Sequence, residues 1–187
     1  RVLFGKIRLN VIMLPDSIRL LNNNNFIEHD INSIIIPNTI TEIGSYVFSE
    51  CSSLTNITIP NSVTKISDDT FSGCSSLVSI TIPNSVTKIG HYAFTGCSSL
   101  ANITIPNSVT KIGNEAFSGC SSLKNITIPN SVTEIGECVF SSCSLLVKIA
   151  IPNIIEIIGR HVLFGKTRLI GIVLPDSIRI LNNNTFI

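Results

Sequence analysis

Cysteine is the residue type in this chain with the richest potential chemistry, because thiolates bind metals and pair into disulfides. Five of the six cysteines recur at one constant interval: Cys51, Cys74, Cys97, Cys120 and Cys143. A zinc site needs ligands that converge from different directions, with spacings such as C-x₂-C, and cysteines this far apart along the chain do not provide them. We therefore expect no metal site.

The regular spacing leaves two interpretations of the cysteines. If successive repeats stack at the distance between parallel strands, about 4.8 Å, their Cα atoms fall within the roughly 4.4 to 6.8 Å range of a disulfide. In-register side chains point the same way, however, and a free cysteine behaves as a small buried hydrophobe. We favour a column of unpaired buried thiols over disulfides. The sixth cysteine, Cys138, shares its repeat position with Glu115 and His161, which predicts a surface thiol.

The other reactive residues show no catalytic arrangement. His29, His91 and His161 fall in different repeats, so no nucleophile and base can be paired through them. Asp68 and Asp69 form the only pair of adjacent carboxylates and are most simply a solvated edge. Serines recur at turn positions, where hydroxyls satisfy backbone groups: Ser75, Ser76, Ser98, Ser99, Ser121 and Ser122. These patterns predict a protein that is not an enzyme and has no cofactor.

The elements that position these residues are copies of one repeat. All eight prolines form a single series with the same interval as the cysteines, except that the first interval is one residue shorter: Pro15, Pro37, Pro60, Pro83, Pro106, Pro129, Pro152 and Pro175. A period of about 23 residues is the signature of a solenoid or a related repeat architecture. We use the word coil for one copy of the repeat and column for the residues at one position in successive coils.

The coil from Pro83 to Ile105 shows the pattern of buried positions. Leu100, Ile103 and Ile105 have the spacing L-x-x-I-x-I, which ends in the alternation of a strand with one buried face. Further apolar residues return side chains to the interior from the rest of the coil: Val86, Ile89, Ala93 and Phe94. The phenylalanine recurs as Phe48, Phe71, Phe117 and Phe140. Each coil is therefore predicted to be lined with apolar side chains all round.

Small and polar residues predict where each coil bends. One column consists almost entirely of residues that tolerate positive φ and predicts a left-handed corner: Asn22, Gly44, Ser67, Gly90, Gly113, Gly136, Gly159 and Asn182. The Pro-Asn-Ser segment is a second corner, since proline has no N–H to give to the next coil. The segment that leads to each phenylalanine, such as 91–94, is too short for an independent helix, and we expect one helical or 3₁₀ turn there.

A single coil cannot fold alone, because burying its few apolar side chains does not offset the conformational entropy of ordering its whole backbone. Stacking covers the open sides of each core layer, so stability depends on neighbouring coils. We therefore predict a single repeat solenoid over residues 1–187, with about seven to eight coils and a parallel β-sheet.

The two ends of the chain are nearly identical. Residues 2–27 and 162–187 match at a constant offset, so that Val2 corresponds to Val162. Neither end carries the polar cap that a free-standing solenoid needs. We expect the chain to be an excerpt of a longer array, and the alternative is a module that stacks end to end on copies of itself.

The pattern I-P-N-S-V-T-K-I-G-x-x-A-F-x-G-C-S-S-L-x-x-I-x-I resembles the BspA-like, treponemal class of leucine-rich repeat, with four near-consensus units between Pro60 and Ile151. The resemblance implies a right-handed α/β-type solenoid with its parallel sheet on the concave face. It also implies adhesion and a location at the cell surface or outside the cell, because family members are mostly surface or secreted proteins. The reduced thiols by themselves leave the cytoplasm open.

Charge and hydropathy argue against two classes of partner. Thirteen Lys and Arg against 12 Asp and Glu give a formal charge of +1 without a basic cluster, which argues against nucleic acid. The apolar stretches fall short of the roughly 18 residues that span a bilayer. We expect no membrane insertion by this segment.

The outward positions of the strands are where we place a binding site. They carry Asn, Ser and Thr, which form a weakly charged, hydrogen-bonding surface, although the same residues suit an exposed strand for purely structural reasons. The candidate partner-binding residues are Asn56, Thr58, Ser79, Thr81, Asn102, Thr104, Asn125 and Thr127. Asn56, Asn102, Asn125 and Asn183 also begin glycosylation sequons, but acceptors prefer surface loops.

Two hypotheses for function follow from the surface and from the ends. The first is a non-catalytic interaction or adhesion module that binds a protein or glycan partner over the concave sheet. The second is a structural solenoid that self-associates through uncapped ends into filaments or long arrays. Ice binding by the Asn-x-Thr ladder is disfavoured, because Lys148 and Ala150 interrupt it.

Overall fold

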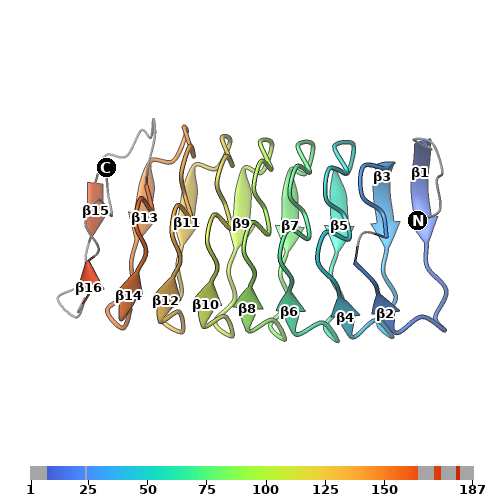
Figure 1. The fold of residues 1–187 in the computed structure, drawn as a ribbon, viewed down its shortest axis with the longest axis horizontal. Helices are drawn as coiled ribbons and strands as arrows, with labels where there is room; N and C mark the ends of the chain where they lie inside the picture. Colours follow the sequence, from blue (N-terminus) through green and yellow to red (C-terminus); the bar gives the residue numbers. More distant parts are fainter. Residues whose placement is uncertain (1–7, 24, 164–170, 174–179, 182–187) are drawn as a thin grey trace.

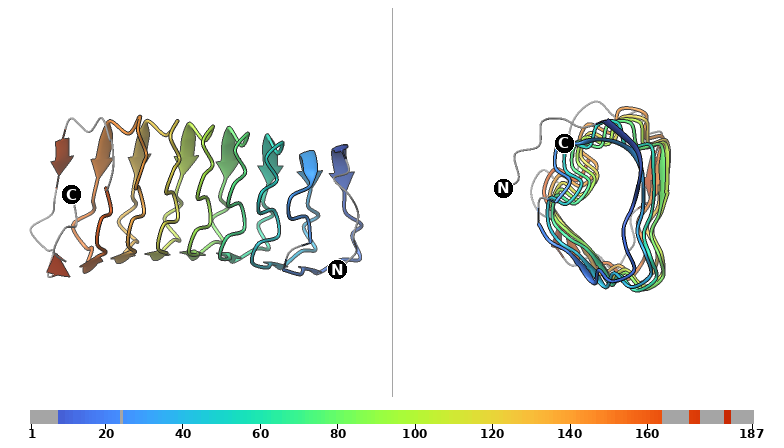
Figure 2. Two further views of the ribbon diagram at one scale, coloured as in Figure 1. Left: turned by 45° about the horizontal axis from the view of Figure 1, so that its top comes forward. Right: turned by 90° about the vertical axis from the view of Figure 1, so that its right-hand side faces the viewer.

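The computed structural model describes residues 8–23, 25–163, 171–173 and 180–181. In these ranges the chain winds into a stack of coils, each displaced along one axis from the coil before it (Figure 1). Viewed along that axis, successive coils superimpose around one common interior (Figure 2). The solenoid predicted from the repeat is confirmed.

Each coil contributes one strand to a parallel sheet, which we call the long-strand sheet. Its strands are β1 (Arg8–Met13), β3 (Asp30–Ile35), β5 (Asn56–Thr58), β7 (Ser79–Thr81), β9 (Asn102–Thr104), β11 (Asn125–Thr127), β13 (Lys148–Ala150) and β15 (Gly171–Val173). They pair in the orders β1-β3-β5-β7-β9 and β11-β13-β15, and β9 lies beside β11 (Figure 1). The pairing is parallel because each strand returns only after a full coil.

A second sheet, which we call the short-strand sheet, was not predicted from the sequence. Its two-residue strands are β2 (Leu20–Leu21), β4 (Glu42–Ile43), β6 (Lys65–Ile66), β8 (Lys88–Ile89), β10 (Lys111–Ile112), β12 (Glu134–Ile135), β14 (Ile157–Ile158) and β16 (Ile180–Leu181). The order is β16-β14-β12-β10-β8-β6, with β2-β4 as a separate pair. In β6, Lys65 is exposed and Ile66 is buried, and β8 and β10 repeat this pattern.

Like residues face one another between neighbouring coils. In the long-strand sheet Thr81 pairs with Thr104, and in the short-strand sheet Ile89 pairs with Ile112. Between β1 and β3 the register is one residue shorter than between later coils, since Arg8 lies opposite Asp30, and this matches the shorter first interval between prolines. The proline spacing therefore sets the register of the stack.

The interior consists of the predicted apolar columns. Leu77, Leu100 and Leu123 each expose 0% of their surface, which confirms the inward assignment of the leucine column. The rings of Phe26, Phe48, Phe71, Phe94, Phe117 and Phe140 stack in one file, with centroids 5.3 to 5.8 Å apart. Phe26 extends the predicted column by one coil. Since an internal ring packs between two others, its truncation would open a cavity between coils.

The cysteine column lies in the same interior and is unpaired, as predicted. Its members, all free and buried, are Cys51, Cys74, Cys97, Cys120 and Cys143. Each thiol donates a hydrogen bond to the carbonyl of the phenylalanine in the preceding coil, as Cys97 does to Phe71 at 3.2 Å. Burial raises the pKa of the Cys51 and Cys143 thiols to about 12 and that of the three between them well above the ordinary value. The column therefore behaves as neutral, buried packing.

The helical or 3₁₀ turn predicted before each phenylalanine is not formed, and the described residues contain no helix. They accordingly hold no apolar helix long enough to span a membrane. The N–H of Phe71 donates to the carbonyl of Ala93 in the next coil at 2.9 Å. In the same way, the N–H of Asp69 donates to the carbonyl of His91, and the N–H of Gly73 donates to that of Thr95. Because these donors connect coils, they cannot close the local bonds of a helix.

The predicted left-handed corner at the glycine column is also wrong. Gly44, Gly90, Gly113, Gly136 and Gly159 have no positive φ, and neither do Asn22 and Ser67, whereas Asn182 lies outside the described residues. Left-handed residues with φ of 52° to 60° follow two positions later: Tyr46, Asp69, Tyr92, Glu115, Cys138 and His161. A second left-handed column, with φ of 57° to 73°, directly precedes the cysteines: Glu50, Gly73, Gly96, Gly119 and Ser142.

Candidate functional site

The outward side of the long-strand sheet, which we call the strand face, arises from alternation along each strand. In β9, Asn102 and Thr104 are exposed, whereas Ile103 between them is buried. Strands β5, β7, β11 and β13 show the same pattern. The eight predicted binding residues therefore all lie exposed on one face: Asn56, Thr58, Ser79, Thr81, Asn102, Thr104, Asn125 and Thr127.

The side chains of the strand face are largely free of internal contacts. Within the described part of the chain, the threonine hydroxyls of this row make no hydrogen bond to the protein: Thr58, Thr81, Thr104 and Thr127. Asn56 donates only to the neighbouring Thr55 hydroxyl, at 3.3 Å. Their donors and acceptors are therefore available to another molecule.

Sequence reasoning missed an apolar area at the β1 end of the strand face. Val11, Met13 and Ile35 expose 55%, 76% and 51% of their surface. Met13 pairs with Ile35, and Ile35 with Thr58, so these apolar residues continue the threonine row. A shallow hollow of about 320 Å³ lies beside them and includes Ile35, Asn56 and Thr58 in its lining. The signal in the sequence was the replacement of Thr by Met13 and Ile35 two residues before the proline.

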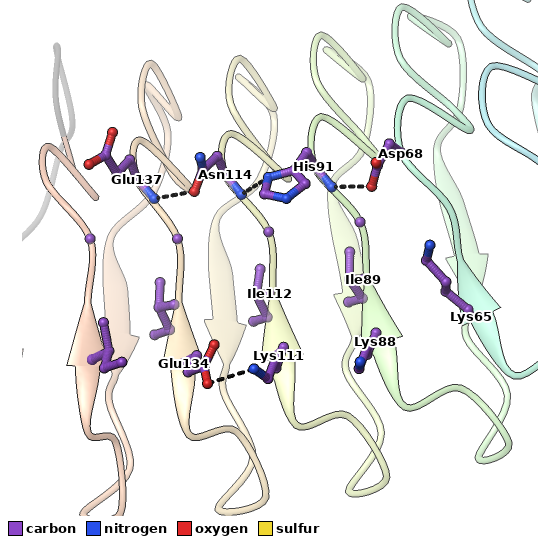
Figure 3. A pocket seen from close by; sticks show the side chains of 16 residues that line it. Lys65, Asp68, Lys88, Ile89, His91, Lys111, Ile112, Asn114, Glu134 and Glu137 are labelled. Carbon is purple, nitrogen blue, oxygen red and sulfur yellow. Dashed lines mark hydrogen bonds and ion pairs between the residues drawn. The ribbon is translucent and has the colours of Figure 1, made fainter.

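The outward side of the short-strand sheet, which we call the groove face, contains a groove of about 470 Å³ along the solenoid axis (Figure 3). The glycine column forms its floor: Gly90, Gly113, Gly136 and Gly159. One wall consists of the outward residues of the short strands: Lys65, Lys88, Lys111 and Glu134. The other wall, which we call the capping column, consists of the residues that follow the glycine column: Asp68, His91, Asn114 and Glu137.

Close approach between coils, rather than backbone conformation, explains the glycine column. A Cβ on Gly113 would lie 2.6 Å from both the carbonyl carbon of Gly90 and the backbone nitrogen of His91. Real Cβ atoms do not come so close to backbone, so a side chain would force the coils apart. Ser67 is an exception, and its buried hydroxyl donates to the carbonyl of Ile43 at 2.7 Å.

The capping column ties each coil to the next one. The Oδ1 of Asp68 accepts the backbone N–H of His91 at 2.9 Å. The Nδ1 of His91 accepts that of Asn114, and the Oδ1 of Asn114 accepts that of Glu137, both at 3.0 Å. Figure 3 shows the three bonds in line along the groove. These side chains accept hydrogen bonds from backbone N–H groups of the turns, which have no partner in either sheet.

The carboxylate pair singled out in the sequence is half-buried and not merely a solvated edge. Asp68 belongs to the capping column, and the side chain of Asp69 accepts a hydrogen bond from Tyr46. Burial raises the pKa of Asp69, and the bond from Tyr46 opposes that shift. Both carboxylates therefore support the turns between coils.

The remaining reactive residues also have structural surroundings. The hydroxyls of Ser98 and Ser121 each donate to the carbonyl of the serine one coil earlier at 3.3 Å, as predicted for turn serines. In the described ranges, no group of three His, Cys, Asp or Glu residues is arranged to hold a metal ion.

Cys138 and the sequon asparagines are more accessible than the buried columns. Cys138 is half-buried, so the prediction of a surface thiol is confirmed only in part. Burial, together with the charges of Glu115 and Glu137, raises the pKa of its thiol.

Three sequon asparagines, Asn56, Asn102 and Asn125, lie exposed within strands, and the fourth, Asn183, lies outside the described residues.

Comparisons with known proteins agree with this architecture. The family described as the BspA type leucine rich repeat region matches residues 2–100 and 64–187, in six copies. A leucine-rich repeat protein of T. pallidum is 28% identical with a TM-score of 0.81, and the match covers 90% of this chain and 79% of that one. No curated protein matches the chain.

Two further solved structures show how widely the fold occurs. A leucine-rich repeat protein from Bacteroides ovatus is 33% identical with a TM-score of 0.67, over 90% of this chain and 52% of that one, so the present chain spans about half its length. The pneumococcal vaccine antigen PcpA is 20% identical with a TM-score of 0.57, over 91% of this chain and 57% of that one, and shares the fold.

Proposed function

The chain belongs to the BspA-type leucine-rich repeat family, and we propose that it is a non-catalytic interaction module of a surface or secreted protein. In this proposal a protein or glycan partner binds across the strand face. The proposal extends the general role of leucine-rich repeat solenoids, which present a broad repeated surface to other molecules.

The observation that carries the proposal is the free hydrogen-bonding row of the strand face. Thr58, Thr81 and Thr104 stand in register on adjacent strands, exposed and without internal hydrogen bonds. Each hydrogen bond to a partner contributes only about 0.5 to 1.5 kcal/mol net, so a partner must engage several coils at once. A repeated row supplies such contacts at regular intervals.

The apolar end of the same face supplies a second kind of contact. Met13 and Ile35 are exposed beside the shallow hollow of β3 and β5. Apolar residues that enter such a hollow from a partner would lose contact with water, which is the main favourable term in most protein associations. We therefore place the strongest contacts at the β1 to β5 end and the specificity-determining hydrogen bonds along β5 to β11.

The experiment compares two triple variants that add the same three charges to the same part of the solenoid. The test variant carries Thr81→Lys, Thr104→Lys and Thr127→Lys on the strand face. The control carries Asn84→Lys, Asn107→Lys and Asn130→Lys, which are exposed at the corner after each proline, outside that face, and whose side chains make no hydrogen bond in the described structure. Both should retain the circular dichroism spectrum of the unmodified chain, since all six positions are exposed.

Binding is measured on arrays of purified extracellular-matrix proteins and of glycans. The unmodified chain and the control should bind the same array members, whereas the strand-face variant should lose at least about tenfold in affinity, the factor that corresponds to about 1.4 kcal/mol. Retention of full affinity by the strand-face variant would place the binding site elsewhere on the solenoid.

A further inference from the structure

The large apolar side chains exposed on the strand face are confined to one half of it. They are Val11, Met13, Ile35 and Val78, which expose between 51% and 76% of their surface. The first three lie in β1 and β3, and Val78 directly precedes β7. Exposed apolar side chains gathered in one area mark a site of interaction. We call this part of the strand face, from β1 to β7, the apolar half.

The other half of the strand face carries two lysines. Lys124 directly precedes β11 and Lys148 begins β13, and both are exposed. Lys148 lies opposite Asn125, the residue after Lys124, so the two lysines occupy neighbouring positions on adjacent coils. In the described part of the chain neither of them forms an ion pair. Strands β1 and β13 lie toward opposite ends of the stack, so the apolar and the cationic residues are well separated (Figure 1).

No carboxylate opposes these two charges on the strand face. Strands β5, β7, β9, β11 and β13, and the residue before each of them, contain no Asp or Glu. Asp30 lies at the start of β3, on the apolar half, where it accepts a hydrogen bond from the hydroxyl of Ser53 at 2.9 Å. The groove face differs in this respect, because its Lys111 is paired with Glu134. The cationic half of the strand face therefore favours a partner with negative charge.

The apolar half favours a protein over a glycan as that partner. Met13 and Ile35 lie opposite each other, and their side chains offer no hydroxyl, amide or charged group. The hydroxyls of a sugar would be buried against them without hydrogen bonds, which costs free energy. Protein interfaces, by contrast, are enriched in Met and in buried apolar anchors. Tyr46 and Tyr92, the exposed rings that suit a sugar ring, lie in turns outside the strand face.

We propose that the partner of the strand face is a protein segment that is apolar at one end and acidic at the other. This inference rests on the function proposed above and specifies its partner. The apolar end of the segment packs in the hollow beside Ile35, and the carboxylates of its acidic end pair with Lys124 and Lys148. Five strand intervals separate β3 from β13, about 24 Å, which an extended segment spans with about seven residues.

The test begins with a selection on the unmodified chain from a displayed library of random 12-residue peptides. The bound peptides should be enriched in sequences with large apolar residues toward one end and Asp or Glu about seven residues away. Synthetic copies of the selected peptides are then titrated and followed by fluorescence anisotropy. Because the ion pairs are exposed to solvent, the affinity should fall as salt is added.

Charge reversal tests the cationic half. The double variant Lys124→Glu, Lys148→Glu should lose about tenfold in affinity for the selected peptides, because two attractions become two repulsions. A peptide in which Lys replaces the acidic residues should bind this variant better than it binds the unmodified chain. The matched control Lys65→Glu, Lys88→Glu makes the same change of charge on the groove face and should bind the selected peptides normally.

Replacement of the apolar anchors tests the other half. The double variant Met13→Ser, Ile35→Ser should also lose about tenfold in affinity, since both side chains are exposed in the free chain and buried only by the partner. Its circular dichroism spectrum should be that of the unmodified chain, because neither side chain belongs to the core.

Four results would overturn the inference. They are a selection without the apolar and acidic pattern, equal losses in the two lysine variants, full affinity in the Met13 and Ile35 variant, and binding to glycans by a chain that selects no peptide. The variant Thr81→Val, Thr104→Val, Thr127→Val separates this inference from the proposed function. If it loses affinity while the Lys124 and Lys148 variant does not, the strand face still binds a partner, but one without the acidic end. If peptides bind it and both double variants at full affinity, the strand face is not the site and the proposed function fails as well.

Discussion

The strand face and the groove face are built from the same repeat, yet they use their outward side chains differently. On the strand face, threonines such as Thr104 make no internal hydrogen bond. On the groove face, Asp68, His91 and Asn114 each accept a backbone N–H of the next coil. The difference arises because the three-residue strands satisfy the backbone N–H and C=O groups of their neighbours within the sheet. In the turn after each two-residue strand, a backbone N–H has no such partner and needs a side-chain acceptor.

This contrast separates positions that hold the stack together from positions that are free to vary. A substitution on the strand face is expected to change binding and leave stability unchanged. A substitution in the glycine or capping column of the groove face is expected to change stability, because those residues set the contact between coils. The side chains of Lys65 and Lys88 on that face have no such role in the described structure.

The largest effect is expected in the core that both faces share. Phe94 is fully buried, with ring centroids 5.3 and 5.4 Å from those of Phe71 and Phe117. Phe94→Ala should lower the free energy of unfolding by about 3 to 5 kcal/mol, as core truncations of this size do. Urea unfolding measures the loss, and an unchanged midpoint would contradict the inward position of the phenylalanine column.

A smaller but clear effect is expected at the floor of the groove. Gly113→Ala places a Cβ at 2.6 Å from the backbone of the preceding coil, which has no room to move aside. Overpacking of this kind costs about 1 to 3 kcal/mol, which urea unfolding would detect. If alanine were tolerated without loss, the coils would have to be further apart than the structure shows.

The smallest effect on the free energy of unfolding is expected when one asparagine is replaced on each face. Asn114→Ala removes the acceptor for the Glu137 N–H and should cost about 1 kcal/mol, as the loss of a helix cap does. Asn102→Ala, the matched control on the strand face, should remain within about 0.5 kcal/mol of the unmodified chain. Equal losses, measured by thermal or urea unfolding, would mean that the capping bond contributes nothing.

Much of this architecture could be predicted from the sequence, because buried columns preserve one residue type. Leucine, isoleucine, phenylalanine and cysteine recur wherever a side chain meets its own copy in the next coil, as the Phe94 ring meets Phe71 and Phe117. The alternation in Asn102-Ile103-Thr104 also identified the exposed face correctly. In each case the physical constraint acts on the side chain itself.

The features that were missed are constraints on the backbone. The left-handed column holds Tyr92, Glu115 and Cys138, whose side chains share no chemistry, so nothing in the residue types reveals it. Its companion column before the cysteines contains Gly73 and Gly96, a signal that could have been used. The short strands escaped notice because two residues cannot show a period. Glycine at Gly113 suggested a corner, whereas the reason for it is the neighbouring coil.

Urea unfolding of two triple variants decides whether the two faces differ as described. One variant carries Thr81→Val, Thr104→Val and Thr127→Val, which remove the strand-face hydroxyls and keep the β-branched shape. The other carries Asp68→Ala, His91→Ala and Asn114→Ala. The first should stay within about 0.5 kcal/mol of the unmodified chain, and the second should lose about 3 kcal/mol, about 1 kcal/mol for each hydrogen bond. Equal losses, or a greater loss on the strand face, would contradict the account.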